Sequence, residues 1–515
     1  MNQRIIAIDQ STSSTKALLF DEQCHMIART NVDHQQYYPQ TGWVEHDAEE
    51  IYENMVEAIR LLVKKYMDCC PQGNECSPKP QGDPVSGFSA SDSQFSLCIT
   101  NQRETVVVWN KLTGKPIARA VVWQDTRGGE LCRQLRSDAK TADMVMKKSG
   151  LLIDPNFSAS GVKCLLDQVE GAREAAARGE LLMGTIDTWL VWKLTGGRVH
   201  ATDYTNASRT MLFNIHTMDW DDDLLQLFDI PRSMMPELRP CDAIYGETTV
   251  EGVFENPIQI AGVLGDSHGA LVGQMCFKQG SGKVTYGTGS SVMVNIGEEP
   301  LPAPEGLVTS VGFSALGRTW YGYEGNIYST GATLKWIADQ LQLVGHPSEM
   351  EALATSVDDN GGVYIVPAFS GLGAPWWQSN VKGAVFGLTF ATTKAHFLRA
   401  ALESIAYQIK DLVDVMAQAT GGKLSEICAD GGPTKNRFLM QFQADMLNTP
   451  VVCTEVDDAS ALGAVVMNGL ARGVWTSFND VVGFRKVTQI YRPQASPSTV
   501  QLYEGWRQAV SQLIK

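Results

Sequence analysis

The feature that most constrains the fold is a strand–turn–strand pattern that occurs once in each half of the chain. In the first half, apolar runs at residues 5–8 and 17–20 flank a small polar turn at 9–15. In the second half, residues 284–286 and 292–294 flank a Gly/Thr turn. Such patterns predict β-hairpins, not the βαβ opening of a dinucleotide-binding unit. The repeated opening therefore predicts two duplicated α/β domains, residues 1–258 and 259–515.

Composition excludes several classes of protein. The chain has 515 residues, enough for two or three domains, and a formal net charge of -15. A nucleic-acid-binding protein would need a basic face, and acidity also disfavours anionic membrane surfaces. The N-terminus lacks a signal-peptide pattern, and no apolar run approaches the roughly 20 residues of a membrane span. We therefore expect no nucleic acid and no membrane as partners.

Cysteine usage points to a reducing compartment. The 11 cysteines are an odd number and are spread thinly, which favours free thiols in a cytoplasmic protein. Cys69, Cys70 and Cys76 could be part of a zinc knuckle, but a fourth ligand of matching spacing is missing. Because residues 69–93 are rich in Pro, Gly and Ser, we expect a surface loop there.

Helical periodicity is clear in two places. Apolar residues at helical spacing occur at 51–63, and a longer stripe runs from Leu398 to Met416. Thr392 or Thr393 is placed to cap the longer helix. Short apolar runs at 97–100, 106–109 and 120–123 predict strands between these helices.

The turn of the first hairpin is a candidate phosphate site, although neither a Walker loop nor a G-x-G-x-x-G motif is present. Its hydroxyl residues, including Thr12, Ser13 and Ser14, offer several donors to phosphate oxygens. Lys16 adds a positive charge, and Asp9 at the strand end can hold Mg²⁺ directly or through water. An ordinary Ser/Thr-rich turn is the alternative interpretation.

The second half offers a matching set. The turn around Thr288 repeats the first turn, and two such turns could clamp a triphosphate. Adjacent glycines, among them Gly432, permit close approach of a flat group, and Asn436 can hydrogen-bond a ribose or a base. Gly331 stands at the start of a predicted helix and can serve similarly. Gly-Gly-Pro is also a plain turn, so this pattern alone is weak.

Asp266 is the candidate catalytic carboxylate. It follows the apolar run 260–264, so it is expected at a strand end, and a small-residue turn follows it. One carboxylate beside a phosphate cradle is the minimum equipment for moving a phosphoryl group onto a hydroxyl.

Long segments of the chain resemble the FGGY family of carbohydrate kinases, nearly from end to end. The similarity covers residues 42–47, 101–105, 184–189, 202–214, 366–375 and 383–403. It is strongest with the members that act on glycerol. The resemblance implies two actin-like, ribonuclease H-like α/β domains with ATP and Mg²⁺ in a cleft between them.

The resemblance also implies roles for single residues. It implies that Asp266 is the catalytic base. It implies that the acceptor is bound by Arg103, Glu104, Trp123, Asn156, Asp266 and Ser267. The phosphates would be bound by Thr12, Ser13, Ser14, Lys16 and Thr288, and the nucleoside by Gly331, Gly432 and Asn436. Asp9 would hold the metal. Lys16 stands where the family often has arginine.

Three positions depart from the pattern of the glycerol-binding members. Asn156 replaces a tyrosine, Ser267 replaces a glutamine, and Ser291 replaces an aromatic residue. Smaller polar side chains free volume and add hydrogen-bonding capacity, which predicts a pocket suited to a longer polyol. His268 could reach the same pocket, or it could pack inside the following helix.

The predicted function is ATP-dependent phosphorylation of a terminal hydroxyl of a small polyol, either glycerol or a longer polyol such as a tetritol. A pentitol or a ketose is the alternative acceptor within the family. Outside enzymes, the alternatives are an actin-like ATPase and a sugar-sensing regulator; the regulator would be expected to carry a DNA-binding helix and a basic face. The resemblance further suggests a homodimer or homotetramer.

Overall fold

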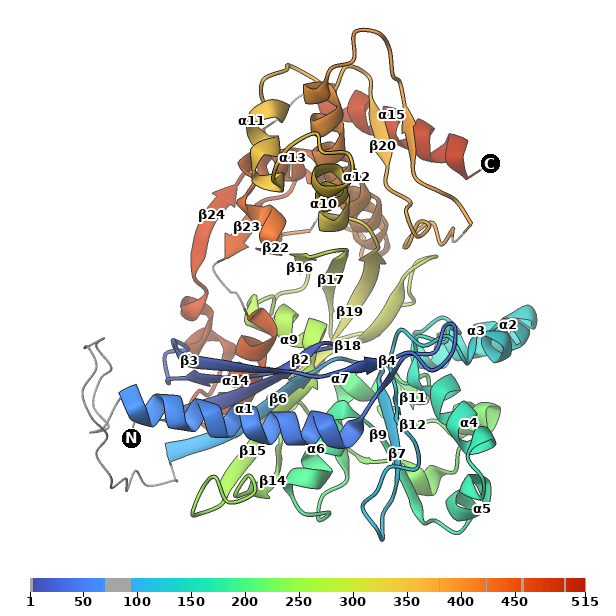
Figure 1. Cartoon of the computed structure of the whole chain (residues 1–515), viewed down its shortest axis with the longest axis vertical. Helices are drawn as coiled ribbons and strands as arrows, with labels where there is room; N and C mark the ends of the chain where they lie inside the picture. Colours follow the sequence, from blue (N-terminus) through green and yellow to red (C-terminus); the bar gives the residue numbers. More distant parts are fainter. Residues whose placement is uncertain are drawn as a thin grey trace. The chain divides into compact units, whose positions relative to one another are not determined.

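The computed structural model describes residues 3–69, 94–378, 380–422, 424–454, 458–494 and 497–514, which form two compact units (Figure 1). Unit 1 comprises Met1–Met275, Ser310–Trp320 and Asp458–Phe484. Unit 2 comprises Cys276–Thr309, Tyr321–Asp457 and Arg485–Lys515. The boundary near residue 258 stays a prediction about the duplicated halves, because the structural units exchange segments of the chain.

The central sheet of unit 1 has the strand order β14-β15-β6-β1-β2-β3. Strands β1 and β2 form the predicted hairpin, which β3 extends into an antiparallel meander. Strands β1, β6 and β15 run parallel, and β14 is antiparallel to β15. The bounds are β1 (Arg4–Gln10), β2 (Ser14–Phe20), β3 (Met26–Asp33), β6 (Phe95–Asn101), β14 (Ile244–Thr248) and β15 (Ile258–Gly265).

The second large sheet, most of whose strands belong to unit 2, repeats this plan with the order β18-β19-β17-β16-β22-β23-β24. Most of β18 lies in the segment Ser310–Trp320, which belongs to unit 1. Strands β19, β17 and β16 are antiparallel, β16, β22 and β23 are parallel, and β24 is antiparallel to β23. The bounds are β16 (Ser281–Tyr286), β17 (Ser290–Gly297), β18 (Val308–Ala315), β19 (Arg318–Ile327), β22 (Glu426–Gly431), β23 (Val451–Thr454) and β24 (Val487–Tyr491). The predicted duplication of a mixed α/β unit is therefore confirmed.

Helices and smaller strands complete each unit. Unit 1 also contains β4 (Gln36–Tyr37), β5 (Glu45–His46), β7 (Val106–Asn110), β8 (Ala120–Val121), β9 (Leu181–Thr185), β10 (Ala201–Asp203), β11 (Phe213–Asn214), β12 (Asp219–Trp220), β13 (Glu237–Arg239), α1 (Ala48–Cys69), α2 (Gly129–Ser137), α3 (Ala139–Ser149), α4 (Ser158–Gln168), α5 (Ala172–Ala177), α6 (Ile186–Leu194), α7 (Tyr204–Ala207), α8 (Asp222–Phe228), α9 (Asp266–Gly273) and α14 (Ala459–Ala471). Unit 2 also contains β20 (Tyr364–Val366), β21 (Ala384–Phe386), α10 (Gly331–Asp339), α11 (Met350–Ala354), α12 (Lys394–Ala419), α13 (Arg437–Leu447) and α15 (Pro497–Leu513). Short 3₁₀ helices are η2 (Arg232–Met234), η3 (Pro347–Glu349), η4 (Gly432–Lys435), η5 (Phe478–Asp480) and η6 (Val482–Phe484).

Strand β1 is buried on both faces, because helices of unit 1 cover both sides of the sheet. Helix α1 packs Ile51, Met55 and Ile59, one residue per turn, into the core that also holds Ile6 and Ile8 (Figure 1). On the opposite face, the Asn468 amide of α14 binds Ser96 Oγ of β6 at 2.9 Å. Full burial of an apolar side chain such as those of Ile51, Met55 and Ile59 stabilises the fold by about 1.5–3 kcal/mol.

Helices α9 and α14 touch at the backbone, where the middle and the end of α9 meet the first turns of α14. A Cβ atom at Gly273 would lie 2.0 Å from the carbonyl oxygen of Ala459, and one at Gly463 would lie 2.0 Å from that of Gly269. Only glycine permits this approach. The contact places Asp458, which precedes α14, and Asp266, which begins α9, within the same unit.

The predicted long helix is α12, and Thr393 is its N-cap, forming a capping box with His396. Most of the predicted loop at 69–93, including Cys70 and Cys76, lies outside the described residues. Across the described part of the chain, every helix is too short or too polar to cross a membrane.

Candidate functional site

Asp266 lies at the predicted strand end. It is the first residue of α9 and follows β15 directly. Its side chain is 38% exposed, and its Oδ1 lies 3.2 Å from Arg103 Nε. Ser267 donates its backbone N–H to the same oxygen at 2.6 Å. The carboxylate is therefore held in place while part of it faces solvent.

Arg103 and Glu104 lie in the tight connection between β6 and β7. The N–H of Thr105 donates to the carbonyl of Arg103 at 2.7 Å, which closes a three-residue turn around Glu104. Glu104 has a φ of 64°, a left-handed conformation that is rare for a residue with a side chain. Such a backbone costs about 1–3 kcal/mol and persists only where its surroundings enforce it.

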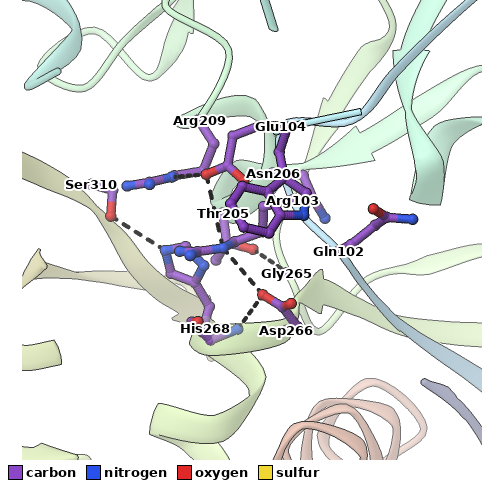
Figure 2. A network of polar contacts seen from close by, with 12 residues as sticks. Gln102, Arg103, Glu104, Thr205, Asn206, Arg209, Gly265, Asp266, His268 and Ser310 are labelled. Carbon is purple, nitrogen blue, oxygen red and sulfur yellow. Dashed lines mark hydrogen bonds and ion pairs between the residues drawn. The ribbon is translucent and has the colours of Figure 1, made fainter. Parts of the chain in front are cut away.

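A line of alternating charges runs through this turn (Figure 2). Arg209 Nε donates to Glu104 Oε1 at 2.6 Å, Glu104 Oε1 lies 3.9 Å from Arg103 Nε, and Arg103 reaches Asp266. Arg209 and Glu104 are buried, whereas Asp266 is accessible. The sequence analysis missed Arg209, although it lies in the segment 202–214, because no spacing rule links it to Glu104.

The turn of the first hairpin is held by hydrogen bonds from two side chains of other segments, Trp123 and His34. Trp123 Nε1 donates to Thr12 Oγ1 at 3.0 Å, and His34 Nε2 donates to the Thr12 carbonyl at 3.0 Å. Trp123 also donates its backbone N–H to Thr105 Oγ1 at 3.2 Å, next to Glu104. Trp123 therefore connects the hairpin turn with the Arg103–Glu104 connection.

Lys16 does not extend into the turn; it lies between two carboxylates. Its Nζ contacts Asp9 Oδ2 and Asp458 Oδ1, each at 2.9 Å, and Arg29 Nη1 lies 3.1 Å from Asp458 Oδ2. Burial raises the pKa of Asp9, an effect that the Lys16 ammonium opposes. Burial alone would lower the pKa of Lys16, but Asp9 and Asp458 outweigh it and raise that pKa. The four formal charges of this cluster cancel.

Asp9 fits a shared metal site better than a resident one. Within the described residues, no group of three or more His, Cys, Asp or Glu side chains could hold a metal ion. Mg²⁺ bound to nucleotide phosphates keeps several waters and needs only one or two carboxylates. Asp9 can supply one carboxylate to an ion that arrives on a nucleotide.

The predicted nucleotide residues of unit 2 gather around the second hairpin turn. Gly331 donates its N–H to the carbonyl of Gly287 at 3.0 Å, next to Thr288. Gly431 has a φ of 101°, and a Cβ there would lie 2.1 Å from the Tyr286 carbonyl. Around Gly432 no atom lies within 4 Å of a built Cβ, so the fold itself does not require glycine there.

A buried lysine supports this second turn and was also missed. Lys283 is 1% exposed, and its Nζ donates to Thr285 Oγ1 at 3.3 Å and to Ser291 Oγ at 3.1 Å. Thr285 Oγ1 donates in turn to Asp430 Oδ2 at 3.4 Å. Ser291 thus has a partner within unit 2.

Other predicted residues have local structural roles in this structure. Asn436 caps α13, accepting the N–H of Leu439 at 2.9 Å. Asn156 donates its backbone N–H to Asp154 Oδ1 at 3.0 Å, just before α4. His268 is fully buried, with its Nε2 3.3 Å from Ser310 Oγ. The interpretation of His268 as an acceptor ligand is therefore disfavoured by its burial.

Comparisons with known proteins match both halves of the chain. The profile described as "FGGY family of carbohydrate kinases, N-terminal domain" matches residues 4–273, and that of the C-terminal domain matches residues 282–472. The chain is 45% identical over 511 residues to the glycerol kinase of Brevibacillus brevis, covering 99% of this chain and 98% of the relative. It is 45% identical over 512 residues to the glycerol kinase of Thermus thermophilus, covering 99% of each.

A solved structure is similar over the same length. The crystal structure of Plasmodium falciparum glycerol kinase with ADP has a TM-score of 0.90 and 32% identity, covering 100% of this chain and 99% of that chain.

Proposed function

This chain belongs to the FGGY family of carbohydrate kinases, and on that premise we propose that it transfers the γ-phosphoryl group of ATP to a terminal hydroxyl of a small polyol of the glycerol class. The relatives named glycerol kinase, matched over nearly their whole length, support this choice of acceptor class. The resulting product is a polyol phosphate, with ADP released.

The observation that carries the proposal is the ion pair between Arg103 and Asp266. Asp266 is the accessible carboxylate of the charge line, and Arg103 fixes its orientation. A carboxylate in this position accepts or orients the proton of an attacking hydroxyl. The family resemblance assigns Glu104 to the polyol as a hydrogen-bond acceptor, although its carboxylate is less accessible than that of Asp266.

Phosphate binding falls to the hydroxyls of the first turn. Thr12, Ser13 and Ser14 donate to phosphate oxygens, and Lys16 supplies a cation when it leaves the carboxylates. Thr288 in the second turn also binds phosphate, while the nucleoside is bound by Gly331, Gly432 and Asn436. Asp9 would hold an Mg²⁺ ion that arrives with the nucleotide, and that ion would supply charge neutralisation of the phosphates. Phosphoryl transfer depends mainly on such positioning and electrostatics.

The acceptor range extends beyond glycerol in this proposal. Asn156 and Ser267 are smaller than the residues of the glycerol-binding members, so a tetritol fits as well. Ser291 supports this idea less, because its hydroxyl binds Lys283. A pentitol or a ketose is the alternative acceptor.

An ADP-release assay tests both levels of the proposal. Purified protein is offered Mg·ATP with glycerol, tetritols, pentitols or ketopentoses, and with no acceptor. We expect turnover with glycerol and the tetritols. Turnover with glycerol alone would contradict the enlarged pocket. ADP release that is independent of any acceptor would support the ATPase alternative and contradict the kinase assignment.

Two further proposals concern the setting of the reaction. We infer a cytoplasmic enzyme, because the cysteines whose side chains the structure describes are free thiols. A homodimer or homotetramer is proposed from the family resemblance, and light scattering of the purified protein tests it.

A further inference from the structure

The strained turn at Glu104 needs support from outside its own segment. The conformation of this turn is unfavourable for a glutamate, and its side chain is buried with a negative charge. A buried carboxylate is tolerated only when charged or polar groups compensate it. The residues that compensate Glu104 therefore decide its position.

Two contacts from distant segments hold Glu104. Ser158 Oγ, at the start of α4, donates to the Glu104 carbonyl oxygen at 2.7 Å. Arg209 Nε donates to Oε1 at 2.6 Å, a charge-assisted bond of the strong class (Figure 2). One contact fixes the backbone and the other fixes the rotation of the carboxylate.

Arg209 is held in place by its own segment, which also binds the ends of two sheet strands. Asn206 exchanges amide hydrogen bonds of 3.0 Å with Asn101 at the end of β6. Thr205 Oγ1 accepts the N–H of Gly265 at the end of β15, directly before Asp266. The segment 203–209 therefore ties the strand that precedes Arg103 to the strand that precedes the candidate base.

Arg209 also reaches the segment that carries another predicted acceptor residue. Its guanidinium lies 5.0 Å from the ring centroid of Phe157, within the range of a cation–π contact. Phe157 follows Asn156 directly. Arg209 is thus packed between Glu104 and the Asn156 segment, while its side chain is only 3% exposed.

We propose that Arg209 is a positioning residue for the polyol: it acts through Glu104, holding that carboxylate in one orientation toward the acceptor. This inference rests on the proposed function, which assigns Glu104 to the polyol. The contacts described for Arg209, with Glu104 and Phe157, lie on the side of the predicted acceptor residues, so its loss should affect the acceptor and spare ATP.

The test compares Arg209→Met and Arg209→Lys with wild type by steady-state kinetics for both substrates. For Arg209→Met we expect the KM for glycerol to rise about 10- to 100-fold, as for loss of a charged hydrogen bond, with the KM for ATP within about twofold. Arg209→Lys should recover part of the loss, because lysine keeps the charge but not the planar donors.

A matched control and a double mutant separate this role from general instability. Arg178→Met removes an exposed arginine that pairs with Glu180 at 2.6 Å and should change neither KM. Glu104→Gln combined with Arg209→Met should be no worse in glycerol KM than Glu104→Gln alone, within about twofold, because Arg209 acts through Glu104. If Arg209→Met does not fold, Ser158→Ala can be measured instead. This milder change removes the hydrogen bond to the Glu104 carbonyl and no charge, and it should also raise the glycerol KM.

The outcomes distinguish the inference from the function on which it rests. Equal increases in both KM values, additive effects in the double mutant, or an unchanged glycerol KM in Arg209→Met would overturn the inference while an active wild type keeps the function. Absence of turnover by the wild type with every polyol would overturn the proposed function and the inference with it.

Discussion

The two hairpins share one backbone plan but distribute their charges differently. In unit 1, the pair next to the turn-closing residues is Asp9 opposite Lys16. In unit 2, the corresponding pair is Thr285 opposite Ser291. The neighbouring parallel strand reverses this pattern, because Thr100 lies beside Asp9 whereas Asp430 lies beside Thr285.

The lysines of the two hairpins differ in exposure and in the groups that they contact. Lys16 is 22% exposed and contacts carboxylates, whereas Lys283 is 1% exposed and donates to hydroxyls at the base of its turn. A partly exposed ammonium can exchange one anionic partner for another, such as a phosphate. A fully buried one is committed to the fold. We therefore propose that Lys16 of the first hairpin can exchange a carboxylate for a phosphate, whereas Lys283 supports the turn of the second hairpin.

Within this comparison of the two hairpins, the largest expected effect concerns Lys16. Lys16→Met should lower kcat/KM about 100-fold or more, because a cation that stabilises phosphate charge is lost. Lys16→Arg should retain most activity, since a guanidinium also reaches carboxylates and phosphates. Steady-state kinetics with Mg·ATP measure both. If Lys16→Met stayed within threefold of wild type, the first hairpin would not differ from the second in this respect.

The buried lysine should affect stability more than chemistry. Lys283→Met should lower the free energy of unfolding by about 1–3 kcal/mol, because Thr285 and Ser291 lose their charged donor. The KM for ATP should rise as the turn loosens, with a smaller change in kcat. Urea unfolding and kinetics on the same preparation check this. Unchanged stability together with a collapse of kcat would show that Lys283 acts in the reaction.

Ser291 should have the smallest effect. Ser291→Ala removes one hydrogen-bond acceptor of Lys283, so we expect a loss of about 1 kcal/mol or less in stability. The preference among glycerol and the tetritols should stay the same within twofold. A shift in that preference would instead place Ser291 at the acceptor and restore it to the pocket-enlargement argument.

Local patterns predicted much of the fold. The two hairpins and α12 with its Thr393 cap follow from apolar patterns and capping chemistry within one segment. The boundary at 258 stays a prediction about the duplicated halves, and local patterns do not reveal that residues 310–320 and 458–484 return to unit 1 from far along the chain. No composition change marks those returns.

In the candidate site, too, some residues could be predicted from the sequence and others could not. Asp266 at a strand end and Arg103–Glu104 beside it could be chosen from the residues and the family resemblance. The partners that hold them could not, because they are distant in sequence: Lys16 and Asp458 are 442 positions apart, and Arg209 and Glu104 are 105 apart. The strained φ of Glu104 likewise depends on those partners and has no local signature.

The most direct test of the central claim is phosphoryl transfer to glycerol by Asp266→Asn, measured beside its affinity for ATP. An asparagine keeps the size of the side chain but cannot accept the hydroxyl proton, so turnover should fall by about 10²–10⁴ while the Kd for ATP stays within threefold. Near-wild-type turnover in this variant would contradict the assignment of Asp266 as the base and, with it, the proposed mechanism.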